Sequence, residues 1–164
     1  MKGVFDPQAR PAYPGVFAFE TDFAGTLVCI PMSVRMKLDQ VGIKLSLKQW
    51  NRMPEEARRE LIDRSCTEAA ATADYRGFLI GLIEKFTASA AEQLPPEPAP
   101  AWADATEVPE RITRWAQAVG VPGPSPGQWA ALTPLQRFTL FKLTRPGHSN
   151  ENFVPAMREF RLLS

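Results

Sequence analysis

The sequence has few of the side chains from which common metal sites are built. Its 164 residues include only two cysteines, Cys29 and Cys66, and one histidine, His148. Structural zinc sites usually need about four cysteine or histidine ligands, so these residues exclude the usual zinc sites. We therefore expect neither a metal site nor a bound cofactor.

Long apolar runs and a strong net charge are also missing. No stretch approaches the roughly 18 uncharged apolar residues of a membrane span, and the start "MKGVFDPQARPAYPG" lacks the apolar core of a secretory signal. The formal net charge of +1 gives no global field that favours nucleic acid or an anionic membrane. We therefore expect a cytoplasmic protein with reduced thiols and with no membrane or nucleic-acid partner.

Apolar side chains at helical spacing run through most of the chain. The longest predicted helix extends from Thr67 to Gln93, and Gly77 and Gly81 lie four positions apart on it, a spacing that permits close contact with another helix. This periodicity predicts an all-α fold, a compact single-domain bundle of about six to eight helices. The apolar positions of the longest helix are Tyr75, Phe78, Leu79, Leu82, Ile83 and Phe86.

Prolines mark the irregular parts of the chain. Residues 1–15 carry three prolines and are predicted to form an irregular N-terminal arm. The following "VFAFETDF" alternates Phe17 with Phe19, which predicts a short extended segment near the N-terminus. Residues 16–164 are predicted to form one helical domain, in which the proline-rich residues 94–108 are a connector across the surface.

Two similar stretches lie about eighty residues apart: "VGIKLSLKQW", ending at Trp50, and "VGVPGPSPGQW", ending at Trp129. The tryptophans differ by 79 positions (129 − 50). In each stretch a predicted helix stops at a glycine, Gly42 or Gly120, which readily adopts left-handed backbone. An internal duplication would give two similar helix–loop–helix halves, and independent use of a common helix stop also fits. Under both interpretations the tryptophans are expected in the core.

Helix starts are marked by hydroxyl side chains. Ser46 is a predicted N-cap before Trp50, and Thr133 is another, with Pro134 at the first helical position behind it. These signals place a short turn of helix and then a longer helix in each of the two similar stretches.

The densest polar cluster is "TRPGHSNENF", which precedes the last predicted helix. Arginine and free backbone amides at a helix start attract anions, so this loop is a candidate anion or partner contact. A purely structural interpretation also fits, with a glycine turn and asparagine caps. The candidate residues are Arg145, Gly147, His148, Asn150 and Asn152.

A second region of the sequence, from Arg35 to Arg59, is rich in basic residues. Arg52, Arg58 and Arg59 lie at its C-terminal end. This region is either an ordinary solvated surface or a docking face for an acidic partner. The candidate docking residues are Arg35, Lys37, Lys44 and Lys48.

Three side chains qualify as reactive groups by residue type. His148 titrates near neutrality and is suited to acid or base catalysis, but the sequence names no partnered nucleophile for it. Cys29 lies between Val28 and Ile30, and Cys66 follows a basic helix end; buried structural thiols are the simpler interpretation for both. No catalytic residue is assigned.

Two blocks of the sequence carry a family resemblance. "CIPMSVRMKLDQVGIKLSLKQWN" and "LTPLQRFTLFKLTRPGHSNENF" resemble the nitrate reductase associated protein family, and the similarity extends from about Phe17 to Phe160. The resemblance implies an accessory role in nitrate assimilation, supporting assimilatory nitrate reductase, a molybdoenzyme, by protein contact. It brings no assigned catalytic residues with it.

Three functional hypotheses follow from the sequence. The leading one is the accessory protein, whose partner is nitrate reductase or its maturation machinery. The second is a small anion sensor that uses the loop from Arg145 to His148, and the third is an enzyme with His148 in a concave site. The sequence favours a non-enzymatic role and leaves the oligomeric state open.

Overall fold

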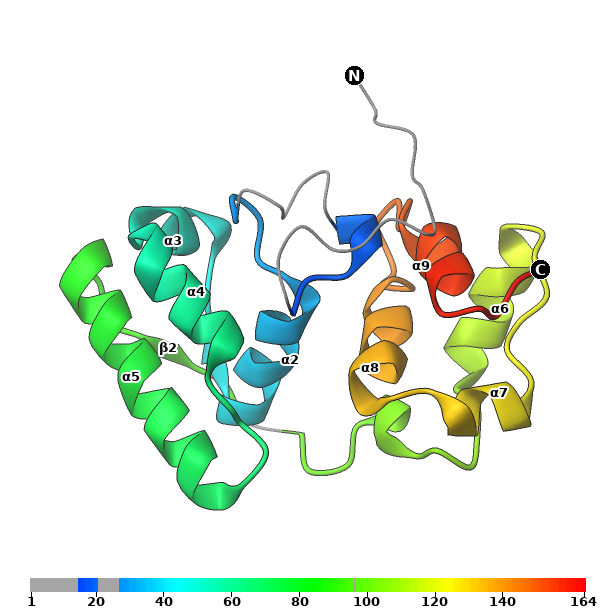
Figure 1. Cartoon of the computed structure of the whole chain (residues 1–164), viewed down its shortest axis with the longest axis horizontal. Helices are drawn as coiled ribbons and strands as arrows, with labels where there is room; N and C mark the ends of the chain where they lie inside the picture. The colour runs from blue at the N-terminus through cyan, green and yellow to red at the C-terminus, as the bar shows by residue number, and fades with distance from the viewer. Residues whose placement is uncertain (1–14, 21–26, 96) are drawn as a thin grey trace. The chain divides into compact units, whose positions relative to one another are not determined.

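The computed structural model describes residues 15–20, 27–95 and 97–164 (Figure 1). Within these ranges the chain forms eight α-helices, two short 3-10 turns and a two-stranded sheet. The predicted all-α class with six to eight helices is therefore confirmed. Apart from Gly15, the predicted irregular arm lies outside the described residues.

The chain packs as two compact units that meet in sequence between Pro98 and Ala99. The N-terminal unit is described up to Pro98, and the C-terminal unit runs from Ala99 to Ser164. The single helical domain predicted for residues 16–164 stays a prediction, because the residues of each unit pack mainly against one another.

The N-terminal unit is organised around α5 (Ala69–Thr87), which packs against α2, α3 and α4 (Figure 1). Its core includes Trp50, Leu61, Leu79 and Ile83, all with no exposed area. The other elements are η1 (Ala18–Glu20), α2 (Met32–Val41), β1 (Ile43–Lys44), α3 (Leu47–Arg52), α4 (Glu55–Asp63) and β2 (Glu92–Gln93).

The C-terminal unit is organised around α8 (Pro134–Lys142), which packs against η2, α6 and α9 (Figure 1). Trp129, Phe138 and Phe153 are fully buried in it. The rings of Trp102 and Phe138 pack edge to face, with their centroids 5.5 Å apart. The other elements are η2 (Ala101–Ala103), α6 (Glu110–Ala118), α7 (Pro126–Ala131) and α9 (Phe153–Glu159).

Part of the helix order repeats in the two units, as the interpretation of two similar halves expects. Helix α7 begins and ends 79 positions after α3, and α8 begins and ends 79 positions after α4. The stops Gly42 and Gly120 both have left-handed backbone, with φ of 70° and 77°. Ser46 and Ser125 each form a capping box with the glutamine three residues later.

The tryptophan after each capping box makes the same kind of bond in both units. The Trp50 indole nitrogen donates to the carbonyl oxygen of Leu27 at 2.7 Å. The Trp129 indole nitrogen donates to the carbonyl oxygen of Asp104 at 2.8 Å. Each fully buried ring therefore ties α3 or α7 to the segment that precedes α2 or α6, as the prediction of core tryptophans requires.

Helix α5 ends six residues earlier than the predicted boundary at Gln93. Ala88 has left-handed backbone with φ of 52°, which stops the helix. Gln93 then pairs with Ile43 in the short antiparallel sheet, and Leu94 donates its N–H to the carbonyl of Gly42. The prediction was wrong here because the pairing partner lies some fifty residues away in the sequence.

The expected extended segment is replaced, where it is described, by the 3-10 turn η1. The buried carboxylate of Glu20 accepts the Phe17 N–H at 3.0 Å, which closes the turn. The same carboxylate accepts the Met32 N–H at 2.7 Å and so caps the start of α2. Residues 21–23 of the predicted segment lie outside the described residues.

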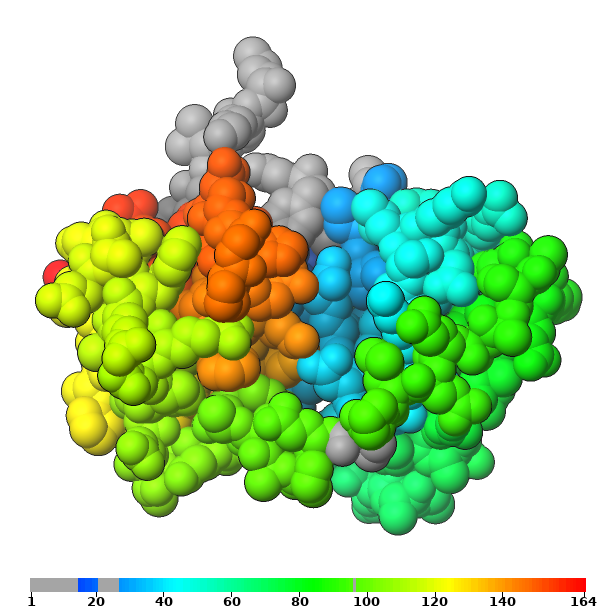
Figure 2. All heavy atoms as spheres, turned by 180° about the vertical axis from the view of Figure 1, so that it is seen from behind, coloured from blue at the N-terminus to red at the C-terminus, as the bar shows by residue number. Residues whose placement is uncertain are grey.

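The predicted connector, residues 94–108, is exposed or half-exposed wherever it is described. Part of it is visible at the surface in the space-filling view (Figure 2). Within it η2 carries Trp102, whose ring contact with Phe138 attaches this stretch to α8.

The glycines of α5 do not serve a close helix contact. A Cβ added at Gly77 or Gly81 meets no atom within 4 Å beyond the neighbouring backbone of α5, so the spacing is not used for such a contact. Both positions are exposed. Glycine at such positions only weakens the helix relative to alanine.

We expect Gly77→Ala to raise the free energy of unfolding by up to about 1 kcal/mol, because it removes backbone freedom from the unfolded chain without adding a clash. Gly120→Ala is the matched control, since its Cβ also meets nothing within 4 Å but its φ of 77° is left-handed. It should lower stability by about 1–2 kcal/mol. Urea unfolding followed by circular dichroism measures both, and a destabilised Gly77→Ala variant would contradict this account of α5.

Candidate functional site

The polar loop between α8 and α9 folds around the main chain of Arg145. The Arg145 carbonyl accepts the His148 N–H at 3.4 Å and the Asn150 side-chain amide at 3.0 Å. Gly147 has a left-handed φ of 77°, so the expected glycine turn is present. The loop is thus ordered by its own hydrogen bonds, and its exposed tip consists of Pro146, Gly147, His148 and Ser149.

Two of the candidate loop residues have side chains without a hydrogen-bond partner in the described chain. Asn152 is the N-cap residue of α9, but its side chain makes no capping hydrogen bond. The His148 side chain is exposed and makes no hydrogen bond with the described chain. The structure therefore provides the imidazole with no catalytic partner among the described residues.

A second arginine, Arg111, lies near enough to Arg145 for their charges to interact. The sequence alone did not indicate it. Arg111 of α6 donates through Nε to the Thr144 hydroxyl and through Nη2 to the Phe141 carbonyl, both at 2.8 Å. Its guanidinium lies 4.0 Å from the centre of the Phe141 ring. Burial lowers the pKa of Arg111, and the positive charge of Arg145 lowers this pKa further.

No acidic side chain neutralises this arginine pair within the described ranges. Neither Arg111 nor Arg145 forms an ion pair there. The buried Nε of Arg145 also has no hydrogen-bond partner. Two guanidinium groups with an unused donor are suited to binding a carboxylate or another oxoanion.

The equivalent helix end in the N-terminal unit, that of α4, has an uncharged residue at the position that matches Arg145. Lys37 of α2 caps the end of α4 there, donating to the Ile62 carbonyl and, at 2.7 Å, to the Arg64 carbonyl. Position 66, which precedes Arg145 by 79 positions, is a cysteine. The end of α4 therefore has one capping cation, Lys37, and no cation at the position equivalent to Arg145.

The predicted basic docking residues have different surroundings. Arg35 donates through Nε to the Ile30 carbonyl at 3.2 Å, and Lys37 caps α4. Lys44 lies 3.9 Å from a Glu92 oxygen in a surface ion pair. Only Lys48 is exposed with no side-chain partner in the described chain. As a docking face these residues stay a prediction.

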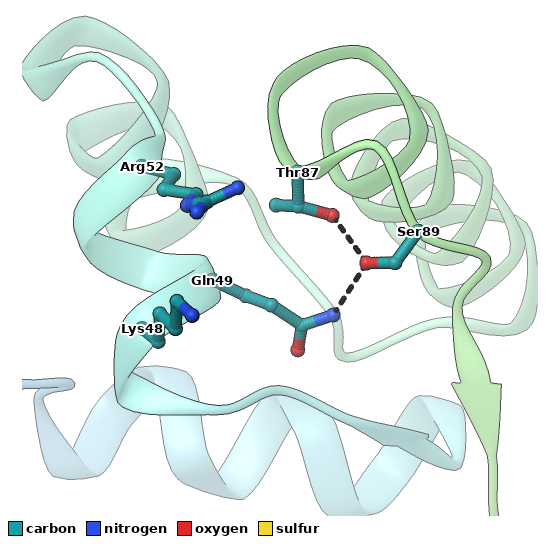
Figure 3. Close-up of a pocket in the computed structure, with 5 residues that line it drawn as sticks. All are labelled: Lys48, Gln49, Arg52, Thr87 and Ser89. Carbon is teal, nitrogen blue, oxygen red and sulfur yellow. Dashed lines mark hydrogen bonds between the residues drawn. The ribbon is translucent and has the colours of Figure 1, made fainter.

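Lys48 lines a pocket that the sequence analysis did not identify. The pocket lies between α3 and the end of α5, and its volume is about 170 Å³ (Figure 3). Its lining residues are Lys48, Gln49, Arg52, Thr87 and Ser89. The sequence signal was the pair of cations four positions apart on α3, but Thr87 and Ser89 join it only through the packing of α5.

The two thiols have different exposure. Cys66 is 4% exposed, and burial raises the pKa of its thiol above the ordinary value. The basic residues before it therefore do not produce a reactive thiolate. Cys29 is half-buried against the core of the N-terminal unit.

The described chain has neither a cluster of metal ligands nor a helix suited to a membrane. No cluster of three or more histidine, cysteine, aspartate or glutamate side chains with metal-binding geometry occurs in residues 15–20, 27–95 and 97–164. Over the same ranges, no helix combines the length and the apolar character that crossing a bilayer requires.

Together these observations define an all-α protein of two similar helical units, each with two cations that form no ion pair with the part of the chain that the structure describes. The chain belongs to the conserved nitrate reductase-associated protein family, whose model matches residues 16–160. This match confirms the resemblance seen in the sequence. Comparisons with curated proteins and with solved structures find no match.

We expect Cys29 to react with a thiol reagent at least about tenfold faster than Cys66 in the folded protein, because burial blocks access and suppresses the thiolate. Cys66→Ser and Cys29→Ser leave one thiol each, so the two rates are measured separately. In urea the rates should become similar. Equal rates in the folded state would contradict the burial of Cys66.

Proposed function

We propose that the protein is a cytoplasmic accessory protein of nitrate assimilation, which supports the maturation or the activity of nitrate reductase, a molybdoenzyme, by direct contact. The family match over residues 16–160 carries this proposal. The family's name links its members to nitrate reductase. The contact itself, with the enzyme or with its maturation machinery, is the part that experiments must establish.

Two surface features support a role in contact. The tip of the loop after α8 presents Gly147 and His148 to solvent on a backbone fixed by hydrogen bonds. Such a tip binds a partner with little loss of conformational freedom. Unpaired cations in both units favour a partner surface with acidic groups, because charge complementarity speeds association and selects partners.

Deleting the gene in the native host should lower nitrate reductase activity in cells grown on nitrate, because the enzyme loses its accessory protein. Activity and the amount of enzyme protein should be measured together, which separates a defect in maturation from a defect in turnover. The wild-type gene should restore both. Unchanged activity in the deletion strain would count against the proposal.

The contact loop can be tested in the same strain. His148→Ala removes an exposed side chain without a partner in the described chain, so the fold should be kept. We expect this variant to capture less nitrate reductase from cell extract than the wild type does. Arg114→Ala is the control, since Arg114 makes only an exposed ion pair with Glu110 on α6. Equal capture by all three proteins would remove the loop from the contact.

Small-anion sensing is a second candidate function, and the uncompensated pair Arg111 and Arg145 favours it. The mutual repulsion of the two guanidinium groups is relieved when an oxoanion binds. Under this hypothesis the ligand is small, and the loop from Arg145 to His148 reports its presence.

Calorimetric titration with nitrate, molybdate and phosphate tests this candidate. We expect Arg145→Gln to weaken binding by about tenfold or more, since charge-assisted hydrogen bonds are lost. Arg114→Gln should bind as the wild type does, because it removes one positive charge from an exposed position of α6 and leaves Arg111 and Arg145 in place. Absence of heat with all three anions would rule the candidate out.

A further inference from the structure

The pocket between α3 and the end of α5 has the properties of an anion site. Its volume of about 170 Å³ is well above the roughly 10–15 Å³ that a cavity needs to hold one water. It therefore has room for a small oxoanion group and several waters. Figure 3 shows Lys48, Gln49 and Arg52 on α3 facing Thr87 and Ser89 across it.

The two cations of this pocket lack the acidic partners that neighbouring cations have. Arg59, Arg64 and Arg114 each form an ion pair with a glutamate four positions earlier on their helix. Lys48 and Arg52 form no ion pair and no side-chain hydrogen bond in the described part of the chain. They lie four positions apart on α3, where like charges destabilise a helix.

The second repeat shows that the scaffold does not need these charges. The positions equivalent to Lys48 and Arg52, each 79 further along, are Gly127 and Ala131 of α7. Helix α7 keeps its capping box and its buried Trp129 without them. The charges of α3 are therefore an addition to the common design, and packing gives no reason for them.

A chain of hydrogen bonds decides which donors remain free in the pocket. The Thr87 hydroxyl donates its one proton to the Ile83 carbonyl at 2.6 Å, so at 2.7 Å it accepts from the Ser89 hydroxyl. Ser89 in turn accepts from the Gln49 amide nitrogen at 3.4 Å. Both hydroxyl protons are thus used, and the free donors are N–H groups of Lys48, Arg52 and Gln49.

The orientation of Gln49 is fixed by its second role. Its side-chain oxygen accepts the Ser46 N–H at 2.9 Å in the capping box. The amide nitrogen, and not the oxygen, must therefore face the pocket. The capping box that starts α3 in this way also adds a positively polarised donor beside the two cations.

We propose that this pocket binds an oxoanion group, of which a carboxylate is the simplest example. Two positive charges and free N–H donors match a group that only accepts hydrogen bonds. The group is carried by a small free anion or by an acidic segment of a protein. The proposal is independent of the role in nitrate assimilation, since it concerns the chemistry of the pocket alone.

The test is a titration of isotope-labelled protein by NMR at constant ionic strength. The probes are acetate, inorganic phosphate, a glutamate-rich peptide and the same peptide with glutamine in place of glutamate. The side-chain amide of Gln49 and the backbone amide of Ser89 report on binding. We expect shifts with at least one of the first three probes and none with the glutamine peptide.

The double variant Lys48→Gln with Arg52→Gln should weaken binding by about tenfold or more. The double variant Arg59→Gln with Arg114→Gln removes the same two charges outside the pocket and should bind as the wild type does. Ser89→Asp is a second variant, which places a carboxylate in the pocket and should abolish binding while both cations remain.

Each outcome decides the proposal. Shifts with acetate or phosphate identify a free anion, and shifts with the glutamate peptide alone identify an acidic protein segment. Both results support the site if the Lys48 and Arg52 variant loses them. Absence of shifts with every probe, or equal binding by that variant, would overturn the proposal and leave the role in nitrate assimilation untouched.

Discussion

Each unit depends on one buried indole whose N–H must find an acceptor. A buried, unpaired indole N–H costs free energy, so a carbonyl brought to Trp50 and to Trp129 favours their place in the core. Leu27 and Asp104 provide these carbonyls from the segments before α2 and α6. The capping boxes at Ser46 and Ser125 fix where α3 and α7 begin, and thereby where each ring points. Both units therefore share the buried indole, its carbonyl acceptor and the capping box before it.

Local signals in the sequence predicted most of the helices, and long-range contacts account for the errors. The stops at Gly42 and Gly120 and the N-caps at Ser46 and Thr133 act within a few residues, so the sequence alone identifies them. The Glu20 carboxylate caps α2 from twelve positions earlier, which no local pattern indicates. Likewise, α5 ends early because Gln93 pairs with the distant Ile43.

The candidate sites were predictable to a lesser degree. The polar residues after α8 and the basic residues of α2 and α3 stand out in the sequence, but their partners do not. Arg111 approaches Arg145 only because α6 packs against α8, and Thr87 meets Arg52 only because α5 packs against α3. Comparing the repeats position by position gives a further signal, since a charge present in one copy and absent in the other is not needed for packing.

The number of residues between each indole and its carbonyl acceptor sets the entropic cost of forming that bond. Trp50 reaches back 23 positions to Leu27, and Trp129 reaches back 25 to Asp104. The entropic cost of closing a loop grows only with the logarithm of its length, so both closures are inexpensive steps. Each unit can therefore close its ring-to-carbonyl bond at a modest entropic cost, set by a loop of 23 or 25 positions.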